Sequence, residues 1–396
     1  MRHRIQSSAQ RPDSPRRGRL NGFTLIELLV GLVLGMLTVL VISTVLANAE
    51  GKRRTIAMGS DAQANGTLSL YTLQRDMQMA GYGAAINPEA LGCAIKGEYK
   101  DPSADASLPA IPFSTTLAPV VITDGAGGAP DQITVLQSRT RRFSAPMLLS
   151  INHPKTTEVF TVKSTFGATA GDLMIAVPAG GGDADNWCTV FTVTDAGSGG
   201  ATGTVLDGTQ VPHKSGGTSK WNRSSVFPDA GYLTGSYLLN MGQMSFNSYS
   251  IDANQNLVVT GITADAATGT PEILYPQIVN LQAMYGKATA GTTQVSSYDN
   301  TTPTTAADWQ RVLAIRIALV ARSNQYEKDI VTSSAPLWDV GASSTISGTV
   351  ACGTSKCIQL KINHVPDWQH YRFKVYDTVV PLRNVLWNSA KTPGSS

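Results

Sequence analysis

A long apolar run near the N-terminus limits how this chain can fold. Between Phe23 and Ala49 the one charged side chain is Glu27. The 19 residues of 28–46 are all uncharged, which is about the length an α-helix needs to cross ~30 Å of hydrocarbon. The run is too long for the apolar part of a secretory signal peptide, although ANA at 47–49 resembles a cleavage site. We therefore expect a membrane-spanning helix.

Basic residues before this run predict its orientation. Residues 1–22 hold six arginines and one aspartate, so the rest of the chain is close to −2 although the whole has a formal charge of +3. Arginine beside a membrane helix favours the cytoplasmic side, which places the remainder outside. After Arg54 the only basic cluster is RTRR at 139–142, interpreted as a solvated loop or strand end. Nucleic acid is therefore not an expected partner.

The position of Glu27 needs an explanation, because a charged side chain at mid-helix costs about 2.5 to 3.5 kcal/mol on insertion scales. With Gly22 before Phe23, the stretch NGFTLIELLVGLVLGMLTVLVI (21–42) resembles the leader junction and first helix of type IV prepilins and pseudopilins. The resemblance implies cleavage between Gly22 and Phe23 by a prepilin peptidase, and methylation of the Phe23 amino group. It also implies that Glu27 helps the subunit enter the growing filament, where a neighbour's terminal amine can meet the carboxylate.

The helix is expected to continue past the membrane. Apolar residues at 70, 73, 77 and 80 recur with helical spacing before Gly81 and Gly83. This pattern predicts a helix over 24–80 whose outer half packs on a globular head. Four glycines are expected to be weak points, each costing about 1 kcal/mol relative to alanine. They are Gly35, Gly51, Gly59 and Gly66.

After residue 84 the pattern is one of strands and loops. Short β-branched or aromatic runs predict strands at 131–138, 158–163, 171–178, 188–194, 255–261, 311–322 and 370–380. Stretches rich in Gly, Ser, Thr, Ala and Pro predict surface loops at 98–129, 195–220 and 287–308. The expected fold class is α+β and pilin-like, with a long N-terminal helix packed on an antiparallel β-rich head. Its expected parts are a leader (1–22), a helix (23–83, spanning the membrane over about 23–47) and a head (84–396).

Later segments narrow the resemblance to the PilW-type minor pilins. The similar segments are LQRDMQMAGYG (73–83), GAPDQITVL (128–136), GDLMIAVP (171–178), WCTVFTVT (187–194), PQIVNLQAMYG (276–286), RVLAIRIALVARS (311–323) and YRFKVYDTVVPLRNVLW (371–387). The resemblance implies a minor subunit that primes assembly with other minor pilins and the major pilin, at or near the filament tip and under a large tip adhesin. It implies support of adhesion and twitching motility. Before assembly the subunit would be held in the inner membrane with its head in the periplasm, and afterwards it would lie in the extracellular pilus.

Four cysteines follow the membrane run. In an oxidising compartment an even set is expected to pair. Cys352 and Cys357, in CGTSKC, are close enough to close a small loop, and Cys93 would then pair with Cys188. Metal binding is disfavoured, because only one close pair of cysteines is present.

Catalytic patterns are missing, so neither an enzyme nor a cofactor is expected. The sequence has no HExxH, GxSxG or GxxxxGK[ST] motif, and its histidines (3, 153, 213, 364 and 370) are scattered. His364 and His370 are near Asp367 and Asp377 but are interpreted as exposed strand-end residues. Asp183 and Asp185 have the spacing of a calcium loop without its further ligands, which favours a plain turn.

Two other functions fit parts of the sequence. A minor pseudopilin of a type II secretion system would share every N-terminal feature. A membrane-anchored periplasmic enzyme or binding protein would need no cleavage after Gly22.

Overall fold

The computed structural model describes residues 22–389, apart from 106, 141, 143, 195–202, 207, 217–218 and 263–268. The side chains of residues 52, 54–58, 388 and 389 are not described. The predicted leader, except for Gly22, lies outside the described residues. The chain forms two compact units, Met1–Ala57 and Met58–Ser396.

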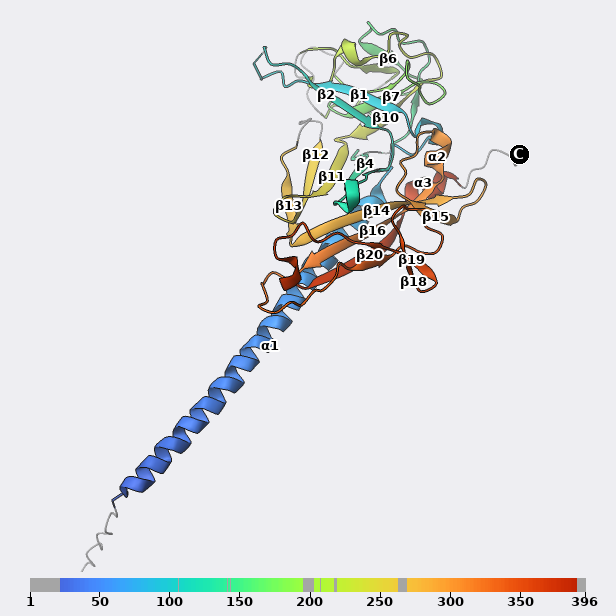
Figure 1. Ribbon diagram of the computed structural model, residues 1–396. Helices are drawn as coiled ribbons and strands as arrows, with labels where there is room; N and C mark the ends of the chain where they lie inside the picture. The colour runs from blue at the N-terminus through green and yellow to red at the C-terminus, as the bar shows by residue number, and fades with distance from the viewer. Residues whose placement is uncertain are drawn as a thin grey trace, which may run out of the picture. The chain divides into compact units, whose positions relative to one another are not determined.

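The first element is a helix of 55 residues, α1 (Leu25–Met79), which is drawn in blue in Figure 1. It confirms the helix expected over 24–80, and it continues through all four glycines predicted to be weak points. The helix ends where Gly81 and Gly83 take left-handed backbone angles, with φ of 76° and 77°. Glycine adopts such angles at little cost because it has no β-carbon, and it therefore often ends a helix.

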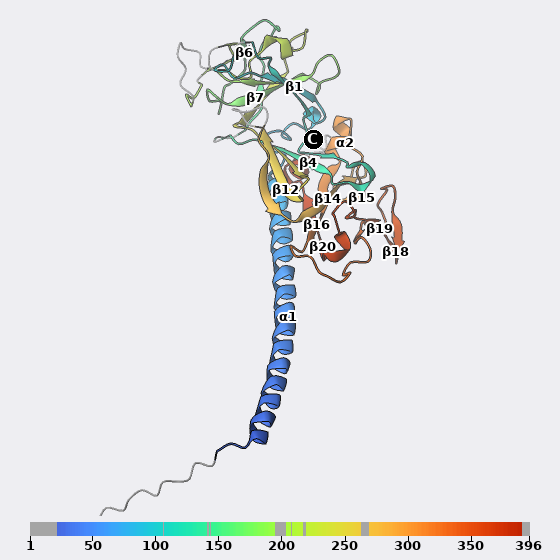
Figure 2. The same ribbon diagram turned by 60° about the vertical axis from the view of Figure 1, so that its left-hand side comes forward.

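In the second unit, a four-stranded antiparallel sheet packs on the C-terminal half of α1. Its order is β15 (Val295–Asp299), β14 (Ile278–Ala288), β16 (Val312–Arg322) and β20 (Phe373–Pro381). The predicted stripe on α1 is buried here, since Leu73 and Met77 share a core with Ile315 and Ile317. Figure 2 shows β14, β16 and β20 beside this part of the helix.

A five-stranded antiparallel sheet completes that core. Its order is β13 (Glu272–Pro276), β12 (Asn256–Ile262), β11 (Ser245–Ile251), β4 (Gln132–Gln137) and β3 (Val120–Thr123). Ile133 and Val135 of β4 are fully buried against the apolar stripe of α1. One hydrophobic core therefore joins the helix to both sheets.

A six-stranded sheet forms a second part of this unit. Its order is β2 (Ile111–Thr116), β1 (Ala94–Tyr99), β8 (Cys188–Thr192), β7 (Leu173–Val177), β10 (Tyr237–Gly242) and β5 (Met147–Leu148), and β6 (Val159–Thr161) pairs with β9 (Gln210–Pro212) beside it. Successive residues of a strand face opposite sides of a sheet. Leu173 and Ile175 enter one core while Met174 and Ala176 enter another, so this sheet is covered on both faces. We call residues 93–117 and 138–244 the six-stranded lobe.

Short elements complete the structure. They are the sheet of β17 (Leu337–Asp339), β19 (Ser355–Gln359) and β18 (Val350–Cys352), the helices α2 (Ala306–Gln310) and α3 (Arg383–Ser389), and single turns at Pro88–Ala90, Ala126–Gly128, Ser224–Val226 and Trp368–His370. Asn384 of α3 donates to the carbonyls of Met79 and Ala80 at 3.3 and 2.9 Å. The C-terminal helix thereby satisfies carbonyl groups left open at the end of α1.

The predicted strands are confirmed, but the predicted loops are wrong in part. The stretch 98–129 contains β2 and β3, 195–220 contains β9, and 287–308 contains β15 and the start of α2. Of these, β2, β3 and β15 are sheet edges, where a strand needs a partner on one side only and tolerates polar residues. The sheets are also not wholly antiparallel, because β1 pairs with β8 in parallel.

Candidate functional site: the N-terminal segment and its head

The residues expected to carry cleavage and assembly lie at the start of α1. Gly22 has no atom within 4 Å of the position a β-carbon would take, and Phe23 is 87% exposed. Both precede the helix, in backbone without regular structure. A peptidase that needs an extended, accessible bond would find one here.

Glu27 begins α1 as one half of a capping box. Its Oε2 accepts hydrogen bonds from the backbone N–H of Thr24 at 3.0 Å and from the Thr24 hydroxyl at 2.9 Å. The Glu27 N–H donates in return to the Thr24 hydroxyl at 3.4 Å. This exchange satisfies donors that the first helical turn leaves open. The carboxylate is thus held locally by one oxygen, while Oε1 accepts no hydrogen bond within the described chain.

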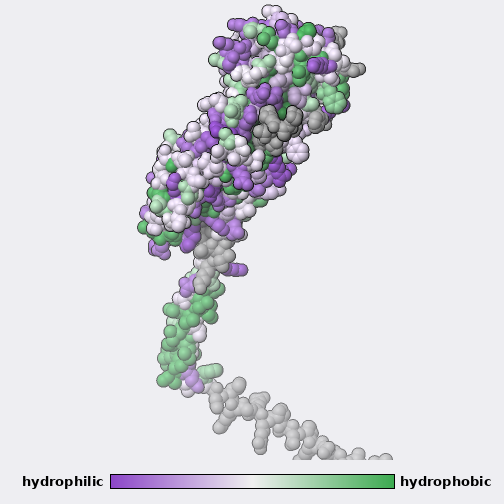
Figure 3. Space-filling model, turned by 90° about the vertical axis from the view of Figure 1, so that its right-hand side faces the viewer, coloured by the Kyte–Doolittle hydropathy of each residue, from purple (hydrophilic) through white to green (hydrophobic). Residues whose placement is uncertain are grey.

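The helix surface that follows Glu27 is apolar and uncovered. Leu25–Gly51 is long and apolar enough to cross a membrane, and none of it is buried in the structure. Figure 3 shows hydrophobic side chains covering this part of α1. Such a surface needs lipid or other apolar side chains around it, so this helix could anchor the chain in a membrane.

Further along α1, Asp76 joins the helix to the five-stranded sheet. It accepts hydrogen bonds from Gln137 Nε2 at 3.2 Å, Asn247 Nδ2 at 3.0 Å and the Tyr249 hydroxyl at 2.7 Å. Burial, and after it the charge of Asp76, raise the pKa of Tyr249, so the phenol stays a donor. The sequence pattern did not single out Asp76, because its partners lie 61 or more residues away.

Gly66, which was expected to weaken the helix, lies where α1 contacts β20. A β-carbon at Gly66 would lie 2.2 Å from Cε2 of Tyr376 on β20. The Tyr376 hydroxyl donates to the carbonyl of Ala62 at 3.4 Å, one turn earlier. The Tyr376 ring therefore lies against the helix at a position where only glycine leaves room.

Asp131 is a second polar residue that the sequence pattern did not assign. Its two carboxylate oxygens accept from the backbone N–H groups of Gly125 at 2.9 Å and Ala283 at 2.7 Å. The residue is 1% exposed, and burial raises its pKa to about 7. Through the bond to Ala283, Asp131 links the start of β4 to β14. These strands belong to the two sheets that pack on α1.

Both predicted disulfides are present in the structure. Cys93 joins Cys188 and Cys352 joins Cys357. The first fixes the parallel pair β1–β8 at its beginning, and the second closes the β18–β19 hairpin. Asp339 lies near Cys352 and Cys357, but sulfurs bonded to each other offer no thiolate to a metal.

The polar residues weighed in the sequence as sites do not converge. His364 bonds to the carbonyl of Val279 and His370 to that of Glu327. Asp183 accepts from the N–H groups of Asp185 and Asn186 at 2.9 and 2.8 Å. This is the hydrogen bonding of an Asx turn.

Two histidines that are far apart in the sequence do come together. Nε2 of His153 lies 2.8 Å from Nε2 of His213 inside the six-stranded lobe. Both are buried, at 2% and 4% exposure, and His153 stacks on Phe160 with ring centroids 3.7 Å apart. Burial lowers the pKa of His153 to about 4 and, together with His153, that of His213 to about 3. Both histidines are therefore neutral near pH 7, and their contact is a polar interaction within an aromatic core.

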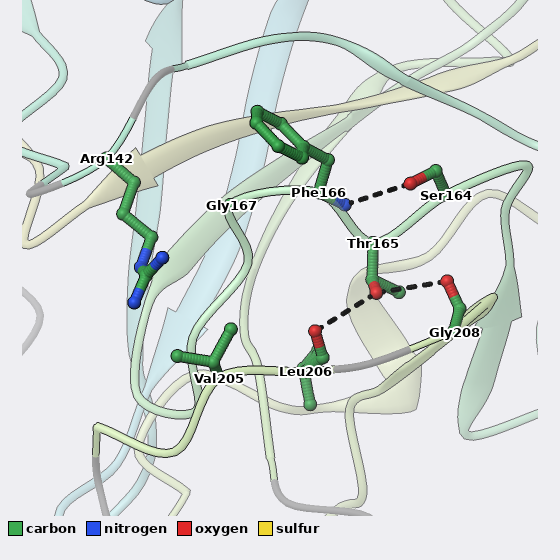
Figure 4. Close-up of a pocket in the computed structure, with 8 residues that line it drawn as sticks. All are labelled: Arg142, Ser164, Thr165, Phe166, Gly167, Val205, Leu206 and Gly208. Atoms are coloured by element: carbon green, nitrogen blue, oxygen red, sulfur yellow. Dashed lines mark hydrogen bonds between the residues drawn. The ribbon is translucent and has the colours of Figure 1, made fainter.

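A pocket of about 520 Å³ opens elsewhere on this lobe, lined by residues 142, 164–167, 205, 206 and 208. Figure 4 shows the Thr165 hydroxyl bonded to the carbonyls of Leu206 and Gly208, and the Phe166 N–H bonded to Ser164. Arg142 is the one charged residue among these lining residues. The side-chain hydroxyls of Ser164 and Thr165 are already hydrogen-bonded within the wall of the pocket. The lining residues therefore do not present a set of free polar groups that converge on a ligand.

Comparison with known families gives one match. Residues 247–384 match PilW, described as type IV pilus-assembly protein W. This segment runs from β11 to α3 and includes the whole four-stranded sheet that packs on α1. No curated protein and no solved structure matches the chain. The family implies involvement in type IV pilus assembly, with other pilus components as partners. Residues 247–384 of this chain are therefore similar to PilW-type components of the type IV pilus.

Proposed function

We propose that the chain is a minor pilin, made as a prepilin, cleaved between Gly22 and Phe23, methylated on Phe23 and inserted into a type IV pilus. The observation that carries the proposal is the single charged side chain, Glu27, on an exposed apolar helix, in a chain whose residues 247–384 match PilW. The fold proposed is pilin-like, and the role is structural, without catalysis.

The geometry at Glu27 supports this use. Thr24 occupies Oε2 and leaves Oε1 open to a second partner. In a bundle of such helices, the terminal amine of a neighbour's Phe23 would supply the missing positive charge. The carboxylate would then cost less in the assembled filament than in the free subunit.

Partners and location follow from the same proposal. The subunit would wait in the inner membrane with its head in the periplasm, be processed by the prepilin peptidase, and join other minor pilins and the major pilin. A position at or near the filament tip, contact with a large tip adhesin, and support of adhesion and twitching motility belong to the proposal. The family match describes pilus assembly, which favours a pilus over the pseudopilus of type II secretion.

The N-terminal mass of the membrane-bound protein tests the processing step. In cells with an active prepilin peptidase, the wild-type chain should lose residues 1–22 and carry a methylated Phe23. Gly22→Val should keep the leader, because the bulky side chain occupies the position before the cut, while Gly22→Ala should still be processed in part. A wild-type chain that keeps residues 1–22, or a Gly22→Val chain processed like wild type, would contradict the proposal.

A further inference from the structure

We propose that a second pocket of the six-stranded lobe binds a small molecule bearing a carboxylate, with Arg223 as its charge partner. The pocket has a volume of about 200 Å³. Its wall is formed by residues 155–158, 213, 215, 222–224 and 227. It lies outside residues 247–384, and it does not depend on how the chain is used in a pilus.

Arg223 is the first reason. Its guanidinium makes no hydrogen bond or ion pair within the described chain, and Nε is buried without an acceptor. Buried donors are paired in nearly all proteins, because an unpaired one loses its hydration and gains nothing. A guanidinium also presents a planar fork that fits the two oxygens of a carboxylate. An anion in the pocket would therefore supply the missing hydrogen-bond acceptor and the missing negative charge for Arg223.

The other charges of the pocket are already engaged. Lys155 pairs with Asp229 at 2.6 Å. Glu158 accepts the N–H of Ser215 at 3.1 Å through Oε1. Among the lining residues Arg223 is thus the cation without a partner, and the negative charge of Glu158 disfavours ligands with more than one negative charge. This selects a carboxylate over a doubly charged phosphate.

His213 lines the same pocket. Its Nε2 lies 2.8 Å from Nε2 of His153, so this ring nitrogen is already engaged inside the lobe. Burial, and after it the neighbouring His153, lower the pKa of His213 to about 3. The ring is therefore a neutral polar part of the pocket wall, and it leaves recognition of a negative charge to Arg223.

The remaining wall limits the body of the ligand. Phe227 contributes an aromatic face, and the hydroxyls of Thr156 and Ser224 make no hydrogen bond within the described chain. A volume near 200 Å³ admits a ligand about the size of a single ring. The pocket is therefore suited to a compact monocarboxylate with an apolar or aromatic body.

Binding of benzoate to the full-length protein in detergent tests this inference, with benzamide as the uncharged control and inorganic phosphate as the multiply charged one. Saturable binding of benzoate, measured by calorimetry or ligand-observed NMR, is expected to be at least tenfold tighter than that of benzamide or phosphate. Arg223→Gln should weaken benzoate about tenfold or more, as expected for the loss of a charge-assisted pair. It should leave the thermal midpoint nearly unchanged, because Arg223 has no partner to lose.

Arg383→Gln is the matched control, since Arg383 is an exposed arginine on α3 and its replacement removes the same charge. It should bind benzoate like wild type. Ser224→Ala should weaken binding by less than Arg223→Gln does. The inference is overturned if benzoate fails to saturate, if benzamide or phosphate binds as tightly, or if Arg223→Gln and Arg383→Gln have the same effect.

Discussion

Asp76 lies in the last turn of α1, where a carboxylate interacts unfavourably with the helix dipole, yet three side chains of the five-stranded sheet donate to it. Apolar stripes slide over one another at modest cost, whereas hydrogen bonds to one carboxylate define a single position. Asp76 therefore fixes the register of the helix on the sheet. Asp131 does the same between β4 and β14, through two backbone N–H groups.

Replacement of Asp76 by alanine should destabilise the head by about 2 to 4 kcal/mol, because three donors lose their acceptor. Asp76→Asn should cost less, since its amide oxygen still accepts part of the network. Asp61→Ala is the control on the same helix, because Asp61 is exposed and makes no hydrogen bond in the described chain; it should change stability by less than about 0.5 kcal/mol. Urea unfolding followed by tryptophan fluorescence measures all three, and equal effects of Asp76→Ala and Asp61→Ala would remove the anchoring role.

The His153–His213 pair predicts a loss of stability in acid. Both pKa values are lower in the folded state, about 4 and about 3, than the usual 6.5. Between pH 6.5 and 4 the unfolded chain therefore binds protons that the folded chain does not. The unfolding free energy should be fully present above pH 6.5 and fall, as the pH decreases, by about 1.4 kcal/mol per pH unit for each histidine.

The double variant His153→Phe with His213→Phe isolates this effect. It keeps aromatic side chains in the cluster and removes both titrating groups, so its stability should change less between pH 6.5 and 4 than that of wild type. The comparison cancels the contributions of carboxylates elsewhere in the protein. An identical slope in both proteins would show that the pair is not the acid-sensitive element.

At the level of elements, the long helix could be predicted well because two independent patterns define it. The uncharged run 28–46 gives its first half, and the stripe containing Leu73 and Met77 gives its second. The strands β7, β8 and β16 were also predictable, since nearly all of their residues are buried and such strands are rich in apolar residues. The edge strands β2, β3 and β15 were not, because polar edges have the composition of loops.

The side chains that hold the elements together were the hardest to predict. His153 and His213 are 60 residues apart, and Gly66 and Tyr376 are on elements at opposite ends of the chain. No periodicity relates such residues, and only the packing of the sheets brings them together. For Gly66, a glycine that lowers helix propensity proves to be the position where the Tyr376 ring of β20 contacts α1.

Alanine at two of these glycines should therefore have opposite effects. Gly66→Ala should destabilise the head by about 1 to 3 kcal/mol, since its β-carbon would overlap the Tyr376 ring. Gly59→Ala should stabilise the helix by up to about 1 kcal/mol, because nothing lies within 4 Å of its β-carbon position. Thermal unfolding of the two variants checks the signs. If Gly66→Ala is stabilising as well, the Tyr376 contact does not constrain the helix.

For the whole molecule, the buried part and the exposed apolar part of α1 are separate segments of the helix. The four- and five-stranded sheets bury the C-terminal half of α1, whereas none of the described residues covers Leu25–Gly51. Substitutions at the start of the helix can therefore alter what the chain assembles with while leaving the head intact. Glu27 is the position where this separation can be measured, because it carries both a helix cap and the one charge of the apolar run.

Three variants separate the cap of Glu27 from its charge. Glu27→Gln keeps an oxygen that can accept from Thr24 but removes the charge, and Glu27→Ala removes both. Thr24→Val keeps the charge and removes the hydroxyl of the capping box, at a cost of about 1 kcal/mol to the helix start. If the carboxylate serves a neighbour's terminal amine, Glu27→Gln and Glu27→Ala should both be depleted from sheared filaments relative to the membrane pool, while Thr24→Val should remain close to wild type.

The measurement is the filament-to-membrane ratio of each variant in a strain that still makes pili from its major subunit. All variants should reach the membrane in similar amounts, because removal of an acid from an apolar helix favours membrane residence. A ratio for Glu27→Gln equal to that of wild type would mean that the cap, and not the charge, is what assembly needs. Unchanged ratios for all three would mean that the helix acts as a simple anchor, and the proposed role of Glu27 in the filament would be wrong.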